Sequence, residues 1–197
     1  MVLIPDFITH YHPAEDAPFQ NLSDVQQEDL PTIIEHLQKR REAGSKRVFG
    51  RTYMDFRKDT EIKLRQLFIE AGGKPERSVP HYFVLGSSEW FAGLYPRTGS
   101  VRVSLSALSP ETTSFTYPDS VVAMRFGPKY GLPPDPIRPY HEQVFLIDQL
   151  AEMIGQYGLP DDGGSASDAY VDYHKKEFEK YIEVQVWSDD PIRHLLR

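Results

Sequence analysis

Cysteine is absent from the 197 residues of the chain. The chain therefore forms no disulfide and offers no thiolate for metal binding or nucleophilic catalysis, a composition that fits an intracellular protein. No apolar run approaches the roughly 20 residues of a membrane span. The N-terminal stretch MVLIPDFITHYHP lacks the basic start and apolar centre of a secretion signal. We expect a soluble, cytoplasmic protein.

The common enzyme fingerprints are also missing. The sequence contains no Gly-x-x-x-x-Gly-Lys-Ser phosphate loop, no Gly-x-Gly-x-x-Gly dinucleotide motif, no Gly-x-Ser-x-Gly elbow and no His-Glu-x-x-His helix. Any catalytic site must therefore be recognised from less specific patterns.

Size and composition predict one domain over residues 1–197. With 40% hydrophobic residues, a chain of this length can bury one substantial core. We expect two parts within this domain, a basic helical segment at 23–72 and a strand-rich part at 79–187.

The charge is uneven along the chain. Residues 38–65 contain ten basic and four acidic residues and carry +6, so the rest of the chain carries −13. Such a segment is typical either of a solvated helix face or of a surface that attracts phosphates. If it binds nucleic acid, the candidate contacts are Lys39, Arg40, Arg41, Lys46 and Arg47.

Hydrophobic spacing predicts helices at 23–43, at 53–72 and at 148–158. Asp29 and Asp148 are the candidate N-caps of the first and third helices, and Gly44 and Gly158 are the residues that end them. The first two helices carry nearly all of the basic segment.

Short stretches of strand composition follow residue 78, separated by turn residues. They lie at 79–85, 101–107, 121–126, 143–147 and 181–187, with long loops at 131–139 and 159–168. Strands that follow helices in this way indicate an α+β fold.

The stretch KYIEVQVWSDD at 180–190 places one carboxylate in the middle of a predicted strand. Ile182, Val184 and Val186 alternate with their neighbours and so share one face, while Glu183 lies with Gln185 on the other. We expect Glu183 to face a polar cleft and to bury little surface.

Two histidines near the N-terminus are candidate metal ligands. His10 and His12 flank Tyr11, and in a strand this spacing points both imidazoles to one side. Asp119 or His174 could complete a site, which would indicate a metal-dependent hydrolase. The alternatives are that the histidines are surface residues or strand caps, and that Asp119 belongs to a turn with Pro118.

Four separated segments resemble the DNA ADP-ribosyltransferase toxins, the DarT family. VPHYFVLGSS at 79–88 is similar to their Val-Pro-x-Tyr-Phe strand and NAD-binding turn, and VSLSALSPETTSFT at 103–116 to a strand that runs on into a Phe-Thr pair. ITHYH at 8–12 looks like their first-strand histidine segment, and EKYIEVQVW at 179–187 resembles their closing glutamate-bearing strand. The order of the segments matches.

The resemblance implies an ADP-ribosyltransferase-like mixed or antiparallel sheet with N-terminal helices, and NAD as a substrate. It implies that His10 orients NAD, that Tyr82 stacks on nicotinamide, that Ser87 or Ser88 contacts ribose or phosphate, and that Glu183 is catalytic. The family has an arginine and a proline in the turn where this chain has 85–88, so another cation, Arg51 or Arg47, must serve the phosphates.

The sequence thus supports two main hypotheses. The first is an NAD-dependent ADP-ribosyltransferase-like enzyme that modifies nucleic acid or another macromolecule, in which Glu183 stabilises an oxocarbenium-like ribose. The second is a non-enzymatic module that binds nucleic acid or an acidic protein through its basic helices. The first hypothesis requires His10, Tyr82 and Glu183 to meet at one concave site.

Overall fold

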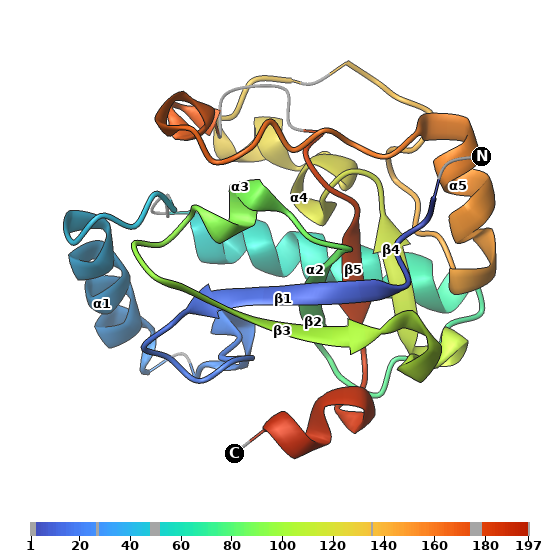
Figure 1. The fold of residues 1–197 in the computed structure, drawn as a ribbon, viewed down its shortest axis with the longest axis horizontal. Helices are drawn as coiled ribbons and strands as arrows, with labels where there is room; N and C mark the ends of the chain where they lie inside the picture. Colours follow the sequence, from blue (N-terminus) through green and yellow to red (C-terminus); the bar gives the residue numbers. More distant parts are fainter. Residues whose placement is uncertain (1–2, 27, 48–51, 135, 174–178, 197) are drawn as a thin grey trace.

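A computed structural model describes residues 3–26, 28–47, 52–134, 136–173 and 179–196. These residues form a mixed α/β structure around one five-stranded antiparallel sheet with strand order β3-β1-β2-β5-β4 (Figure 1). The strands are β1 (Phe7–Pro13), β2 (His81–Leu85), β3 (Thr98–Ser104), β4 (Thr113–Thr116) and β5 (Glu183–Val186). The α-helices are α1 (Leu30–Glu42), α2 (Tyr53–Glu70), α3 (Glu89–Ala92), α4 (Ser120–Ala123) and α5 (Leu150–Tyr157).

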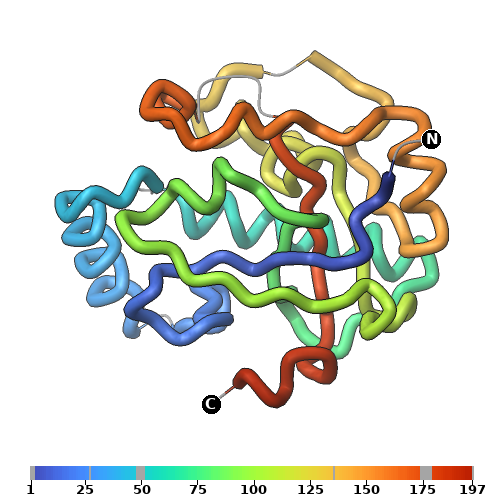
Figure 2. The backbone as a smooth tube through the Cα atoms, in the orientation of Figure 1, coloured from blue at the N-terminus to red at the C-terminus, as the bar shows by residue number. Residues whose placement is uncertain are grey.

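The sheet joins segments from opposite ends of the chain. β1, near the N-terminus, and β5, near the C-terminus, both pair with β2, and their traces cross in the view of Figure 2. In Figure 1, β1 and β3 run horizontally whereas β4 and β5 run vertically, so the sheet twists strongly between its two halves.

β5 is buried on both faces. On one face Val184 and Val186 lie in a core with Phe115 and with Met153 and Ile154 of α5. This face confirms the predicted aliphatic side of the strand. The other face is covered by α2 and α4, where the Trp187 ring stacks on Phe68 at 5.9 Å between ring centres.

Our expectation that Glu183 buries little surface is wrong. Its exposed fraction is 8%, because α2 and α4 lie over the polar face of the strand. A two-residue period shows which residues share a face, but it does not show whether a second layer covers that face.

Two predicted strands are wrong. The segment 121–126 overlaps α4, which begins after Asp119 accepts hydrogen bonds from two backbone N–H groups of the following turn. The segment 143–147 forms only an isolated bridge between Phe145 and Phe115. In both segments apolar composition alone was misleading, since a short buried helix and an irregular core segment have the same composition as a strand.

The helices fit the predictions more closely. The second and third predicted helices correspond to α2 and α5, and the first begins seven residues later than predicted, at Leu30. Asp29 occupies the N-cap position of α1 without a side-chain cap bond, and α5 has Gln149 rather than Asp148 at its N-cap. None of the helices in the described ranges is long and apolar enough to cross a membrane.

Candidate functional site

A cavity of about 190 Å³ lies between α2 and the face of the sheet that carries Glu183. Its walls come from β1, β2, β5, α2, α3 and α4, together with the 20–22 segment, Arg47 and Tyr181. His10, Tyr82 and Glu183 all line this cavity, and so does Arg47. The structure therefore brings together four of the residues that the sequence singled out for an NAD site.

Glu183 sits on β5, an inner strand of the sheet, where its position is fixed from both sides. It pairs with Val84 of β2 and with Thr116 of β4. Its Oε1 accepts hydrogen bonds from the Gln185 side chain at 3.0 Å and from the Ser120 backbone N–H at 3.3 Å. Burial raises the pKa of Glu183, and these hydrogen bonds oppose the rise.

A second buried carboxylate, Asp119, lines the same cavity and is 4% exposed. Its Oδ1 accepts the backbone N–H groups of Val121 at 2.9 Å and Val122 at 3.2 Å, which caps α4. Its Oδ2 is buried and has no hydrogen-bond partner among the described residues. Burial and the neighbouring Glu183 raise the pKa of Asp119 from 3.8 to about 7.

Tyr82 reaches the cavity from the same face of the sheet as Glu183, because the strand register places Tyr82 opposite Gln185. Its hydroxyl donates to Glu61 Oε1 at 2.9 Å, and the guanidinium of Arg57 lies 4.8 Å from its ring centre. Burial raises the pKa of Tyr82 and keeps the phenol protonated.

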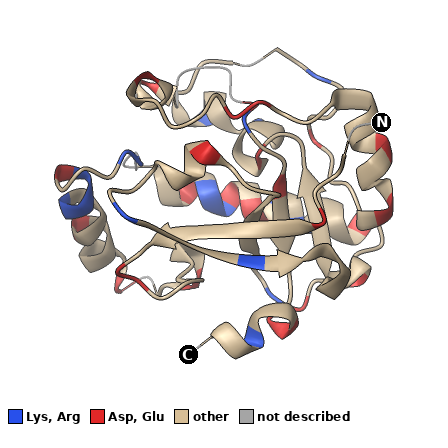
Figure 3. Cartoon of the chain, viewed as in Figure 1, with Lys and Arg blue, Asp and Glu red and all other residues tan. Residues whose placement is uncertain are grey.

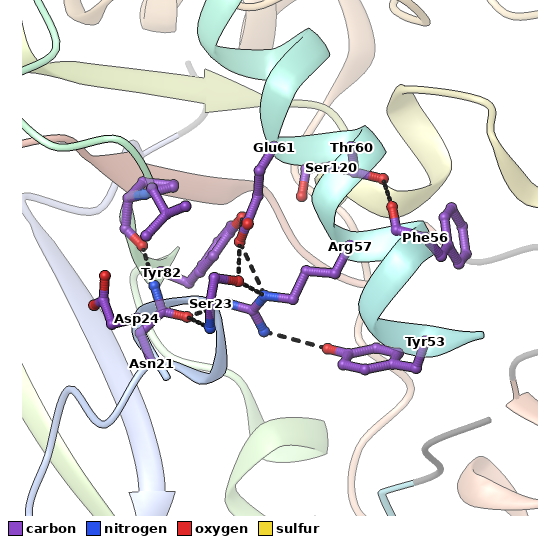
Figure 4. A network of polar contacts seen from close by, with 12 residues as sticks. Asn21, Ser23, Asp24, Tyr53, Phe56, Arg57, Thr60, Glu61, Tyr82 and Ser120 are labelled. Carbon is purple, nitrogen blue, oxygen red and sulfur yellow. Dashed lines mark hydrogen bonds and ion pairs between the residues drawn. The ribbon is translucent and has the colours of Figure 1, made fainter. Parts of the chain in front are cut away.

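Arg57 and Glu61 of α2 organise a polar network beside the cavity (Figure 4). Arg57 Nε donates to Glu61 at 2.9 Å and to Ser23 Oγ at 2.7 Å, and its other nitrogens reach Asn21 and Tyr53. Sequence analysis missed this network. The available signal was the i,i+4 spacing of an arginine and a glutamate on a predicted helix.

Arg47 is half-buried and approaches the cavity from the segment between α1 and α2. Its guanidinium donates to the hydroxyls of Tyr95 at 3.3 Å and Tyr53 at 3.4 Å. Arg51, the other cation considered for a phosphate, lies outside the described residues.

His10 reaches the cavity from the opposite face of the sheet. β1 and β2 pair only at Ile8–Leu85 and Thr9–Val84, and beyond this point the His10 ring lies against β2. Its Nδ1 bonds to the Tyr82 carbonyl at 2.9 Å, and its Nε2 accepts the Phe19 backbone N–H at 3.1 Å. A carbonyl can only accept, so Nδ1 carries a proton. Because Nε2 accepts a hydrogen bond, it carries no proton, and the ring is neutral.

This placement gives His10 a structural task. Burial lowers its pKa from 6.5 to about 4, and both ring nitrogens are already engaged by the backbone. His10 therefore links β1, β2 and the 19–22 segment at the edge of the cavity.

Ser87 and Ser88 do not line the cavity. Ser87 is exposed, and Ser88 is buried, where its side chain accepts the Phe91 N–H as the cap of α3. The Ser88 backbone N–H donates to the Tyr11 hydroxyl at 2.9 Å. The two serines that were predicted to contact ribose or phosphate are thus not among the residues that line the cavity with Glu183.

The proposed metal ligands are not assembled in the part of the chain that the structure describes. No group of three histidine, aspartate or glutamate side chains is placed to hold a metal ion there. His12 bonds to the Pro13 carbonyl, and His174 lies outside the described residues.

The described basic residues of this segment differ in their surroundings, and Figure 3 shows where lysine and arginine lie along the chain. Lys39 pairs with Glu35 at 2.7 Å, and Arg40 pairs with Asp16. Lys46 lies over the Tyr170 ring, and Arg47 and Arg57 face the cavity. The exposed basic residues of this segment, among those that the structure describes, are Lys39 and Arg41 in the last turn of α1 and Lys58 of α2.

Comparison of the chain with protein-family models, with curated proteins and with solved structures gives no match.

Proposed function

We propose that the protein is an NAD-dependent ADP-ribosyltransferase-like enzyme that modifies nucleic acid or another macromolecule. The observation that carries this proposal is that Glu183, on β5, and Tyr82, on the adjacent central strand β2, share one sheet face and line one cavity. Together with the sequence resemblance, this supports a divergent fold of the ADP-ribosyltransferase type.

Glu183 is the proposed catalytic carboxylate. When nicotinamide leaves, the ribose C1 develops positive charge, and a fixed carboxylate that accepts a hydrogen bond from the ribose 2′-hydroxyl stabilises that charge. Hydrogen bonds from Gln185 and Ser120 hold Oε1 in place. Burial raises the pKa of Glu183, and these hydrogen bonds and the positive charge of Arg57 oppose that rise.

The size and walls of the cavity indicate which part of NAD enters it. Its volume of about 190 Å³ is smaller than the roughly 300–1,000 Å³ of sites that enclose a drug-sized ligand. We therefore assign to it the nicotinamide and its ribose, with Tyr82, Phe91 and Tyr181 as aromatic walls. Arg47 is the proposed phosphate-binding residue.

His10 is proposed here as a positioning residue that holds β1 against β2. The acceptor macromolecule would approach from outside the cavity, and the exposed Lys39 and Arg41 supply positive charge for a polyanion. The same two residues would serve a non-enzymatic binding module, for which Glu183 would be only a core residue.

The test combines nicotinamide release with ligand-dependent melting. An NAD site filled at 100 times its dissociation constant adds about 2.7 kcal/mol of stability, which raises the melting temperature. The proposal expects this shift with NAD, and nicotinamide release that falls about 10²- to 10³-fold in Glu183→Gln. A shift with DNA or RNA alone, without one for NAD, would replace it with the binding module.

A further inference from the structure

Asp119 is the residue in the cavity that the proposed chemistry leaves without a task. It is 4% exposed, lines the cavity beside Glu183, and has an Oδ2 with no hydrogen-bond partner among the described residues. A buried polar atom without a partner is costly and needs an explanation. Because Oδ1 already caps the first turn of α4, Oδ2 is the atom through which Asp119 can act on a ligand.

The position of Asp119 relative to Glu183 is fixed by the backbone. Ser120, which follows Asp119 in the chain, donates its N–H to Glu183 Oε1 at 3.3 Å, and the Glu183 N–H donates to the Pro118 carbonyl at 3.3 Å. The two carboxylates therefore sit side by side in the cavity, one on a strand and one at a helix cap.

We infer that Asp119 is the general base of the reaction, accepting the proton of the attacking group while Glu183 holds the ribose. This inference rests on the proposed function. The C1–nitrogen bond between ribose and nicotinamide breaks, and its electron pair leaves with nicotinamide. The oxygen of the acceptor hydroxyl, or of water, bonds to C1, and its proton passes to Asp119 Oδ2 and then to solvent.

Two neighbouring carboxylates can fill these two roles, with Asp119 accepting the proton and Glu183 stabilising the ribose. A base is most effective when its pKa lies near the working pH, and the pKa of Asp119 is about 7. A carboxylate in this position can take the proton that a hydroxyl or water loses when its oxygen attacks C1.

The other titratable and charged side chains of the cavity must be considered in any pH profile. Glu183 and Tyr181 interact electrostatically with Asp119. The remaining ones that line the cavity are His10, Tyr11, Arg47, Tyr53, Arg57, His81 and Tyr82. Burial lowers the pKa of His10 and of His81 and raises the pKa of Tyr82 and of Tyr181, so the shifts of all four groups are directed away from neutrality.

The experiment measures nicotinamide release from NAD alone, with water as the acceptor. Asp119→Asn and Asp119→Ser both keep a side chain that caps a helix, so α4 should persist. We expect kcat to fall about 10²- to 10⁴-fold in both variants while KM for NAD stays close to that of the wild type. Formate should partly restore the turnover of Asp119→Ala, since it supplies a carboxylate in the space that the substitution opens.

The wild-type kcat provides a test that needs no variant. It should rise with pH and level off above neutrality, and this rise should be lost in Asp119→Asn. Wild-type turnover that is independent of pH between about 5 and 9, or an Asp119→Asn variant with wild-type kcat, would show that Asp119 is only a helix cap. If the wild-type protein releases no nicotinamide and NAD does not raise its melting temperature, the proposed function fails as well.

Discussion

The backbone N–H of Ser120 donates a hydrogen bond to Glu183 Oε1 at 3.3 Å. This bond joins the inner strand β5 to the cap of α4, so the two carboxylates of the cavity are held by backbone that is itself hydrogen-bonded. A site in which each acidic group is fixed by its own secondary-structure element has the rigidity that catalysis requires.

Glu183→Gln should separate activity from stability. Gln keeps an oxygen that can accept from Ser120 and Gln185 but removes the negative charge, so we expect nicotinamide release to fall about 10²- to 10³-fold. Unfolding free energy should not fall, because burial disfavours the charge that the substitution removes.

Val184→Ala is the matched control on the same strand. Val184 is fully buried, so its truncation should cost roughly 0.5–3 kcal/mol in urea denaturation while the intact cavity keeps its activity. Full turnover by Glu183→Gln would remove Glu183 from the catalytic role.

The buried ion pair of α2 should matter far more than an exposed pair of the same spacing. Glu61 is 4% exposed and binds Arg57, so Glu61→Gln leaves a partly buried guanidinium without its carboxylate and should cost about 3–5 kcal/mol. Glu35→Gln, in the exposed Glu35–Lys39 pair, should cost less than about 1 kcal/mol. Equal costs in urea denaturation would show that the Arg57 network contributes nothing special to stability.

The sequence predicted an element correctly where the spacing of its buried residues along the chain has the period of a strand or of a helix. The alternation around Val184 and the helical spacing from Phe56 to Phe68 are local patterns, and both elements formed as predicted. The coarse α/β architecture follows from such patterns.

The predictions that were wrong depend on contacts between elements that are far apart in the sequence. The sequence contained Asp119 ahead of a short apolar run, and a capping aspartate followed by Val121 and Val122 is compatible with a helix as well as a strand. Neither the burial of Glu183 nor its proximity to Asp119 could be read from the sequence, because both depend on how α2 and α4 cover the sheet. The engagement of both His10 nitrogens depends on where β1 and β2 separate.

Binding to a polyanion, if it occurs, should depend on Arg41 and not on Arg40. Arg41 is exposed in the last turn of α1, whereas Arg40 is paired with Asp16. Removing one cation that binds a phosphate flattens the logarithmic salt dependence by about 0.9, so Arg41→Ala should show this change and Arg40→Ala should not. The measurement is a salt titration of binding to duplex DNA and to RNA. Identical slopes for wild type and Arg41→Ala would assign Arg41 to a merely solvated surface.

The pH dependence of stability should carry two opposite contributions from the cavity. The pKa of Asp119 is raised from 3.8 to about 7, so between these values the folded state binds a proton that the unfolded state has lost, and its contribution to stability falls as pH rises. The pKa of His10 is lowered from 6.5 to about 4, so between these values the unfolded state binds the extra proton, and stability falls as pH decreases.

Single variants separate these two contributions, since groups that titrate alike in wild type and variant cancel in the difference. Against the wild type, Asp119→Asn should make the slope of unfolding free energy with pH more positive, and His10→Asn should make it more negative. The change is at most about 1.4 kcal/mol per pH unit for one proton. Urea denaturation at several pH values from about 4 to about 7 measures both slopes.

Glu183→Gln should weaken the Asp119 contribution, because it removes the neighbouring negative charge that helps to raise the pKa of Asp119. Curves for Asp119→Asn and wild type that run parallel through this range would mean that the Asp119 carboxyl titrates alike in the folded and unfolded chains, and the buried pair would then lack the coupling that a general base beside Glu183 requires.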